Sequence, residues 1–196
     1  MSYYILVNCL NILTIVVSTQ AAYYGFAFEN DEMFERCPDV PDSFYVAEVV
    51  DNTNIEMNYS EGFVSVSGNH TLKWEGVQPT DRIDANGEVY QFRRGTWQPT
   101  PFSVRIRDFC KVQFDPTSYW YQLWSKHIPV NERKCVNNYG HTYSYEPFTV
   151  DARLELFTNM EGRYKIVGRA FAYDEKNEKR KNTICFQVIG EFYKIK

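Results

Sequence analysis

A stretch near the middle of the chain, residues 101–135, limits most strongly what this sequence can fold into. Phe102, Val104 and Ile106 alternate there with Ser103 and two arginines. This period of two is typical of a strand that has one face on a core and the other in water. One-sided strands of this kind favour an antiparallel sheet over a parallel sheet that is covered on both faces.

The alternation ends after Cys110, and a short helix is expected to follow. Asp115 can accept hydrogen bonds from free N–H groups at a helix start, and Pro116 suits the first helical turn. Four apolar residues then share one helical face: Trp120, Leu123, Trp124 and Ile128. Two interpretations remain open, because this stripe either packs as core across the sheet or lines and gates the mouth of an apolar cavity.

Further runs rich in β-branched and aromatic residues recur along the chain, separated by Gly, Pro and Asn turn signals. Together with 102–109 they predict strands at 44–50, 55–59, 63–74, 88–92, 148–157, 164–173 and 183–193. Eight strands and one short helix predict an all-β fold, either a sandwich or a barrel. We expect residues 23–41 to be irregular, and the charged run 174–182 to be a solvated hairpin tip.

The N-terminal segment 1–21 predicts a secretory signal peptide. It contains an uncharged apolar run at 5–17 followed by small residues that suit a cleavage site. The run is too short to span a bilayer comfortably. The remaining residues, 22–196, have a length that suits a single domain with a real core.

The cysteine count supports the same compartment. Without the signal segment the chain keeps Cys37, Cys110, Cys135 and Cys185, an even number that predicts two disulfides in a secreted, extracellular protein. Two sequons predict N-glycosylation at Asn58 and Asn69.

The search for chemistry gives mostly negative results. The sequence has no G-x-S-x-G, H-E-x-x-H or C-x-x-C motif and no phosphate-binding glycine loop. His70, His127 and His141 lack the spacing of metal ligands. A formal net charge of −4 gives no electrostatic reason to expect a nucleic acid as partner. We therefore expect no enzyme activity, no cofactor and no metal.

Three features together resemble a known family. They are the block Pro101-Phe102-x-Val104-x-Ile106-x-x-Phe109-Cys110, the second cysteine Cys135, and Gly162-Arg163-Tyr164 at the start of a long strand. They resemble insect members of the MD-2-related lipid-recognition superfamily, and within it the secreted chemosensory proteins related to the GM2 activator, the Che families A and B of flies. The resemblance covers about 44–193. It departs from the family pattern after Cys135, where many relatives have Pro and this chain has Val136.

The resemblance implies an immunoglobulin-like β-sandwich whose sheets splay apart around an apolar cavity. It further implies a non-catalytic protein that holds or presents a lipid, cuticular hydrocarbon or pheromone in chemosensory perception, with a chemosensory receptor as partner. The apolar faces of the expected elements predict the cavity wall: Val104, Ile106, Trp120, Trp124, Leu154, Leu156, Ile166 and Val188. Four cysteines allow three connectivities, and we predict Cys37–Cys185 and Cys110–Cys135, because similar sandwiches tie their first strand to their last.

Two alternatives belong to other functional classes. A secreted carbohydrate-binding sandwich would use exposed aromatic side chains such as Trp74 and Trp97. A secreted enzyme is the other alternative, although nothing in the sequence nominates its substrate.

Overall fold

The computed structural model describes residues 21–30, 32–60 and 62–195, and these form a mostly β structure. The predicted signal peptide, apart from Ala21, lies outside the described residues. The strands are β1 (Ala22–Phe28), β2 (Glu35–Arg36), β3 (Val50–Asp51), β4 (Ile55–Ser60), β5 (Phe63–Leu72), β6 (Arg82–Arg93), β7 (Thr96–Ile106), β8 (Thr142–Asp151), β9 (Leu154–Leu156), β10 (Gly162–Tyr173) and β11 (Ile184–Lys194). The helices are α1 (Val46–Val49), α2 (Phe109–Gln113) and α3 (Tyr119–Leu123), with 3-10 turns η1 (Ser125–His127) and η2 (Val130–Glu132).

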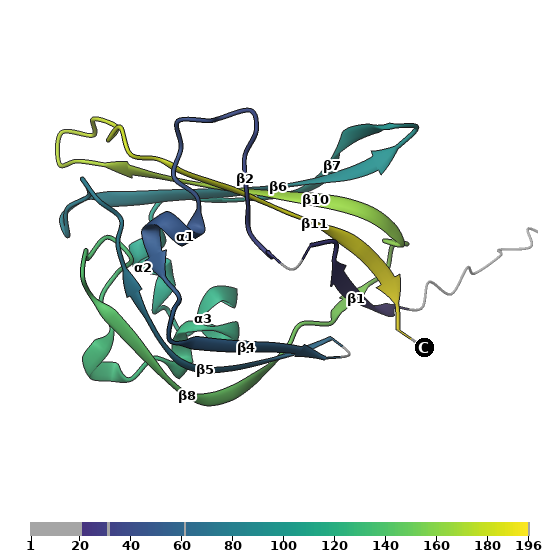
Figure 1. Cartoon of the computed structure of the whole chain (residues 1–196), viewed down its shortest axis with the longest axis horizontal. Coiled ribbons are helices and arrows are strands. Elements are labelled where there is room, and N and C mark those ends of the chain that lie inside the picture. Colours follow the sequence, from purple (N-terminus) through teal and green to yellow (C-terminus); the bar gives the residue numbers. More distant parts are fainter. Residues whose placement is uncertain (1–20, 31, 61, 196) are drawn as a thin grey trace, which may run out of the picture.

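The strands form two sheets that lie one above the other (Figure 1). The larger sheet has the order β7-β6-β10-β11-β1-β9, with β2 beside β11. In the smaller sheet, β5 pairs with β3 and β4 on one side and with β8 on the other. These pairings are antiparallel. The predicted all-β sandwich with little helix is therefore confirmed.

The two ends of the sandwich are closed differently. At one end β1 turns toward the smaller sheet (Figure 1), where the rings of Phe28 and Tyr59 meet edge to face at 5.6 Å. The Ala152 N–H also donates to the Gly62 carbonyl oxygen there, at 2.8 Å. At the other end α1 and α2 contribute Val49 and Phe109 to a buried cluster between the sheets. The helices thus act as spacers where the strands themselves do not meet.

Both disulfides have the predicted pairing. The Cys37–Cys185 bond fastens the segment after β2 to β11. Its sulfurs pack with Val167 on the face of the larger sheet that points away from the smaller one. The Cys110–Cys135 bond joins α2 to the segment that precedes β8.

The single helix predicted to begin near Asp115 is wrong in its start and its length. The Asp115 carboxylate accepts hydrogen bonds from the backbone N–H and the hydroxyl of Thr117, which makes a turn instead of a cap. Ser118 caps α3 by accepting a hydrogen bond from the Tyr121 N–H at 3.0 Å. The backbone leaves the helical conformation at Trp124 and continues as η1. The predicted single aromatic stripe is therefore divided between two parts of the core.

The strand predictions fail where side-chain interactions or non-alternating burial override the local pattern. The run 44–50 contains α1, because the Glu48 carboxylate accepts a hydrogen bond from the Tyr45 N–H and pairs with Arg36. The run 148–157 is interrupted between β8 and β9. The lead-in expected to be irregular contains β1, which is paired with both β11 and β9. Burial along β1 does not alternate simply, because the consecutive residues Tyr24 and Gly25 are both buried.

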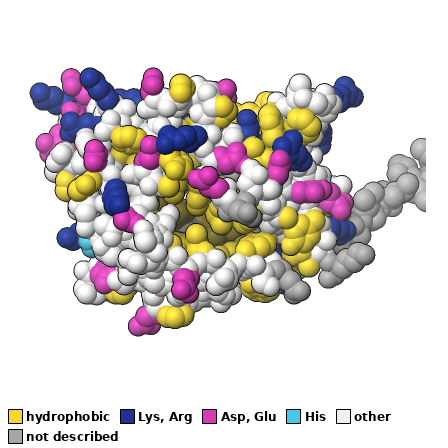
Figure 2. Space-filling view, viewed as in Figure 1, with side chains coloured by type: hydrophobic (Ala, Val, Ile, Leu, Met, Phe, Trp, Pro, Cys, Tyr) yellow, Lys and Arg dark blue, Asp and Glu magenta, His cyan; other side chains and the backbone are white. Residues whose placement is uncertain are grey.

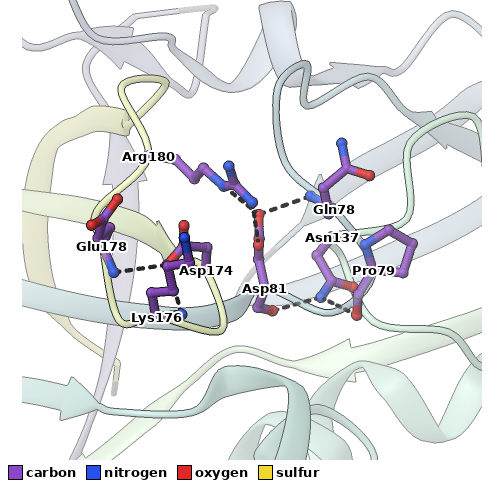
Figure 3. A network of polar contacts seen from close by, with 8 residues as sticks. All are labelled: Gln78, Pro79, Asp81, Asn137, Asp174, Lys176, Glu178 and Arg180. Carbon is purple, nitrogen blue, oxygen red and sulfur yellow. Dashed lines mark hydrogen bonds and ion pairs between the residues drawn. The ribbon is translucent and has the colours of Figure 1, made fainter.

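A buried carboxylate connects three loops near the helical end of the sandwich (Figure 3). The Asp81 side chain is fully buried and accepts two hydrogen bonds from the Arg180 guanidinium, at 3.0 and 2.9 Å. The Gln78 N–H donates a third at 2.9 Å, and the Asn137 amide donates to the carbonyl oxygens of Pro79 and Asp81. Burial by itself raises the pKa of Asp81, but the bonds from Arg180 and Gln78 outweigh it and lower that pKa.

The charged run 174–182 is thus only partly the solvated tip that the sequence predicts. Residues 175–179 are exposed, and the Asp174 carboxylate organises their turn by accepting backbone N–H bonds from Lys176 and Glu178, both at 2.9 Å (Figure 3). Arg180, by contrast, reaches inward to Asp81.

We expect Arg180→Ala to destabilise the fold by about 3 kcal/mol, because it leaves the buried Asp81 charge without its partner. Urea unfolding at neutral pH measures this loss. The control is Lys176→Ala in the same turn, whose exposed side chain should change stability by less than about 0.5 kcal/mol. Equal stability of the two variants would show that the Asp81–Arg180 pair does not hold this end of the sandwich.

Candidate ligand-binding cavity

An apolar cavity of about 240 Å³ lies between the sheets beside α1 and α2. The space-filling view shows the molecule hollowed between the two layers, with hydrophobic side chains inside the hollow (Figure 2). The cavity wall draws on both sheets and on all three α-helices, through residues such as Val46, Leu72, Ile83, Phe109, Trp120 and Ile184. None of the side chains that line it is charged.

Small residues lie on the inner face of the larger sheet, and two of them, Ala85 and Ala170, line this space. Ala85 and Ala170 are opposed in the β6–β10 register, as are Gly87 and Gly168. Gly168 also opposes Phe186 of β11, and a Cβ atom on Gly168 would lie 2.3 Å from the Phe186 ring. The ring can therefore lie over this position only because it is glycine. The larger sheet contributes two alanines, two isoleucines and one phenylalanine ring to the cavity wall.

The side-chain polar atom of Trp74 at the wall is already used within the protein. The Trp74 side chain is only 2% exposed, and its indole N–H donates to the Asn182 carbonyl oxygen at 3.0 Å. A bound molecule would therefore find contact surface there but no free partner for a hydrogen bond from Trp74. This arrangement suits an apolar ligand, because burial of an unpaired polar group costs several kcal/mol.

The residues predicted for the cavity wall are distributed over six places in the structure. Trp120 lines the cavity and meets the Phe109 ring edge to face at 5.3 Å. Ile106 packs against the buried cluster beside it. Ile166 and Val188 oppose one another on the inner face of the larger sheet, farther along the strands. The remaining residues lie elsewhere.

Three of these predicted residues belong to other clusters. Trp124 packs over the smaller sheet, where its indole N–H donates to the Tyr145 hydroxyl at 2.9 Å. Leu154 and Leu156 pack around Tyr24 and Phe192 at the end closed by β1. Their faces were predicted correctly as apolar, but the break between β8 and β9 places them away from the cavity.

The prediction for Val104 is wrong. The side chain shares a face with Ile106, as the alternation implies, but it is 55% exposed. The physical reason is that β7 is an edge strand of the larger sheet. Val104 covers the bare backbone of Gly87 instead, since a Cβ there would meet its Cγ1 at 3.1 Å.

The smaller sheet carries buried hydroxyl groups with defined partners in the cluster next to the cavity. Tyr143 accepts a hydrogen bond from the Gln113 amide at 3.2 Å and donates to the Lys134 carbonyl oxygen. Burial raises the pKa of Tyr143 to about 12, and burial likewise raises the pKa of Tyr145. Both phenols therefore stay neutral at physiological pH, and α2 is connected to β8 through Tyr143.

The cavity residues missed by sequence reasoning carry a signal of another kind. The run Gly168-Arg169-Ala170-Phe171-Ala172 alternates small and large side chains, and its small members face the other sheet. Small residues at inward positions of a strand indicate either close approach of another element or space. The sequence alone cannot separate these two cases.

Trp74, one of the aromatic side chains named for the carbohydrate-binding alternative, is buried and cannot stack on a sugar at the surface. Trp97 is half-buried beside Phe92, and the cations of Arg163 and Lys165 lie 5.1 and 5.2 Å from the centre of its ring.

Within the described part of the chain, no group of three or more His, Cys, Asp or Glu residues is placed to hold a metal ion. None of the described helices combines the length and hydrophobicity needed to cross a bilayer.

A scan against models of known protein families finds no match for this chain, and a search of curated proteins finds no significant relative. The resemblance noted from the sequence therefore stays a prediction.

His70 should make stability depend on pH. It lies on β5 against the rings of Tyr143 and Tyr145, at 5.2 and 5.4 Å, and burial, with a smaller contribution from His141, lowers its pKa to about 4. Between pH 6.5 and 4 the unfolded chain binds a proton that the folded chain does not, so stability falls as the pH falls. The loss is at most about 3 kcal/mol.

His70→Phe removes the titrating group and keeps a flat ring between the tyrosines. Urea unfolding at pH 7.5 and pH 4.5 should show a smaller acid loss for the variant than for the native chain. Comparing the two chains cancels the carboxylates, which titrate in both. Identical losses would mean that His70 is protonated as readily in the folded protein as in the unfolded one.

Proposed function

We propose that this protein is a secreted, non-catalytic carrier that holds a hydrophobic small molecule between its two sheets. The observation that carries the proposal is the apolar cavity of about 240 Å³. Its ligand would be a lipid, a cuticular hydrocarbon or a pheromone, and the role would be presentation of that ligand in chemosensory perception. The resemblance to secreted lipid-recognition proteins supports this role, and the disulfides Cys37–Cys185 and Cys110–Cys135 fit an oxidising compartment.

The apolar wall indicates that the part of the ligand inside the cavity is a hydrocarbon. Each methylene buried there gains about 0.8 kcal/mol, whereas a buried polar group would lose its hydrogen bonds to water and gain few in return. An apolar cavity of about 150 Å³ already binds benzene in another protein, so the larger volume here accommodates a branched or short hydrocarbon chain. A polar head group, where the ligand has one, would stay at the opening.

A cavity-filling substitution tests this function. Ala170→Phe adds a ring where Ala170 lines the cavity, so we expect it to abolish binding of a fluorescent fatty-acid analogue while the fold persists. The matched control is Ala47→Phe, because Ala47 is exposed on α1 between the cavity residues Val46 and Val49. Fluorescence titration of the secreted protein, with native mass spectrometry for co-purified ligand, provides the readout.

Two outcomes of this experiment would contradict the proposal. One is native protein that carries no hydrophobic molecule and does not bind the analogue. The other is undiminished binding by a folded Ala170→Phe variant, which would place the ligand outside the cavity between the sheets.

The gating role predicted for segment 120–128 is best assigned to Trp120. This side chain lines the cavity and is also 43% exposed, so it can move without loss of buried strand pairing. We expect Trp120→Ala to speed ligand dissociation severalfold and to cost only about 1 kcal/mol of stability. Trp124→Ala should instead cost about 3 kcal/mol, because it removes a core ring and the partner of Tyr145.

Stopped-flow dissociation of the fatty-acid analogue and urea unfolding of both variants separate the two roles. If Trp120→Ala slows dissociation or leaves it unchanged, the indole does not control access. If both variants change dissociation in proportion to their loss of stability, the whole segment is ordinary core.

A further inference from the structure

The edges of the two sheets are protected unequally. Exposed edge strands can pair with other chains, and proteins block them with short strands, prolines, charges or bulges. At the edges of the larger sheet, β7 contains Pro99 and Pro101 together with a register shift, and β9 has three residues. In the smaller sheet, β8 contains Pro147 and its own register shift. Three of the edges thus carry recognised devices against pairing.

The fourth edge is β4, and the exposed charge of Glu56 is its one such device. Among the described residues β4 pairs only with β5, over six consecutive residues. Its sequence, Ile-Glu-Met-Asn-Tyr-Ser, contains no Pro, Lys or Arg. Ile55, Met57 and Tyr59 alternate along it, and Met57 is 38% exposed. An alternating edge of low charge is a site at which a second copy could add a strand.

Asn58 stands at the centre of this edge. Ile55 packs in the buried cluster of the smaller sheet and Tyr59 contacts Phe28, so these odd-numbered positions face inward. Asn58 therefore faces outward, where it is exposed and lies opposite Ser65. The Ser65 hydroxyl in turn lies 3.1 Å from that of Thr149 on β8. The outer surface next to Asn58 is made of short hydroxyl side chains, which leave room for a large substituent.

The second sequon asparagine lies on the same face. The hydroxyls of Thr71 and Thr142 are 2.8 Å apart across β5 and β8, while His70 contacts the rings of the inner tyrosines. Asn69 is two residues from Thr71 in the same strand and so shares its outer face. Both sequons thus point away from the cavity, from one polar surface.

We propose that Asn58 and Asn69 carry N-linked glycans, and that the glycan on Asn58 shields the free edge of β4 from pairing with a second copy of this chain. In the transfer, the asparagine amide nitrogen bonds to the anomeric carbon of an oligosaccharide carried on a lipid pyrophosphate. The bond from that carbon to the pyrophosphate breaks, the lipid pyrophosphate leaves, and the amide gives up one proton. The proposal depends on passage through the secretory pathway but not on the ligand in the cavity.

The test removes each sequon and keeps its asparagine. Ser60→Ala abolishes the first sequon and Thr71→Ala the second, while the controls Ser60→Thr and Thr71→Ser preserve both. After secretion from eukaryotic cells, intact mass should fall by one glycan in each alanine variant and in neither control. Light scattering during size exclusion should show Ser60→Ala shifting to dimers or larger species at concentrations where Thr71→Ala stays monomeric.

Trimming of folded native protein with an endoglycosidase provides a second route, because it removes all but one sugar of each glycan and leaves the asparagines unchanged. This sample should associate as Ser60→Ala does. An unmodified Asn58 in the native protein, or a monomeric Ser60→Ala variant and monomeric trimmed protein, would overturn the proposal. Binding of the fatty-acid analogue should be unchanged in every sample. An absence of this binding would contradict the carrier function and not the proposal about the glycans.

Discussion

The separation between the two sheets is the constraint on which the rest of this structure depends. At one end the larger sheet turns inward through β1 until the rings of Phe28 and Tyr59 meet, which brings the layers into contact. At the other end Val49 of α1 and Phe109 of α2 are wedged between the layers. Rigid elements close both ends of the sandwich. The sheets therefore do not come closer together over the small side chains of Ala85 and Ala170. Space remains in the middle as a result.

Polar interactions hold this frame from outside the apolar interior. The Asp81–Arg180 pair lies in the loops at the helical end, and Asn137 connects the same loops to the segment that begins at Cys135. The buried phenols act similarly at the smaller sheet, where Tyr143 joins α2 to β8. In each case the polar atoms are satisfied by partners within the protein. The cavity wall is lined by apolar and aromatic side chains, and this composition favours an apolar ligand.

The sequence predicts most of the sheet and part of the site. Alternation located β4, β5, β10 and β11 within a few residues, because each has one face inward. It failed for α1, where the Arg36–Glu48 pair acts across twelve residues, and for β1, where the consecutive residues Tyr24 and Gly25 are both buried. In the site, Trp120 was found because it is aromatic and inward-facing. Ala170 was missed because its small side chain contributes to the cavity by leaving space. The exposure of Val104 depends on strand order, which a single sequence does not contain.

The disulfides explain how such a chain tolerates internal space. A cavity costs about 24 cal/mol per Å³, so 240 Å³ corresponds to about 6 kcal/mol. In the chain-entropy model, closing loops with sequence separations of 148 and 25 residues contributes about 5 and 3.5 kcal/mol. The two cross-links therefore offset the cost of the cavity. An apolar ligand recovers part of the same cost when it fills the space, so its affinity comes largely from contacts that the protein's own side chains leave unmade.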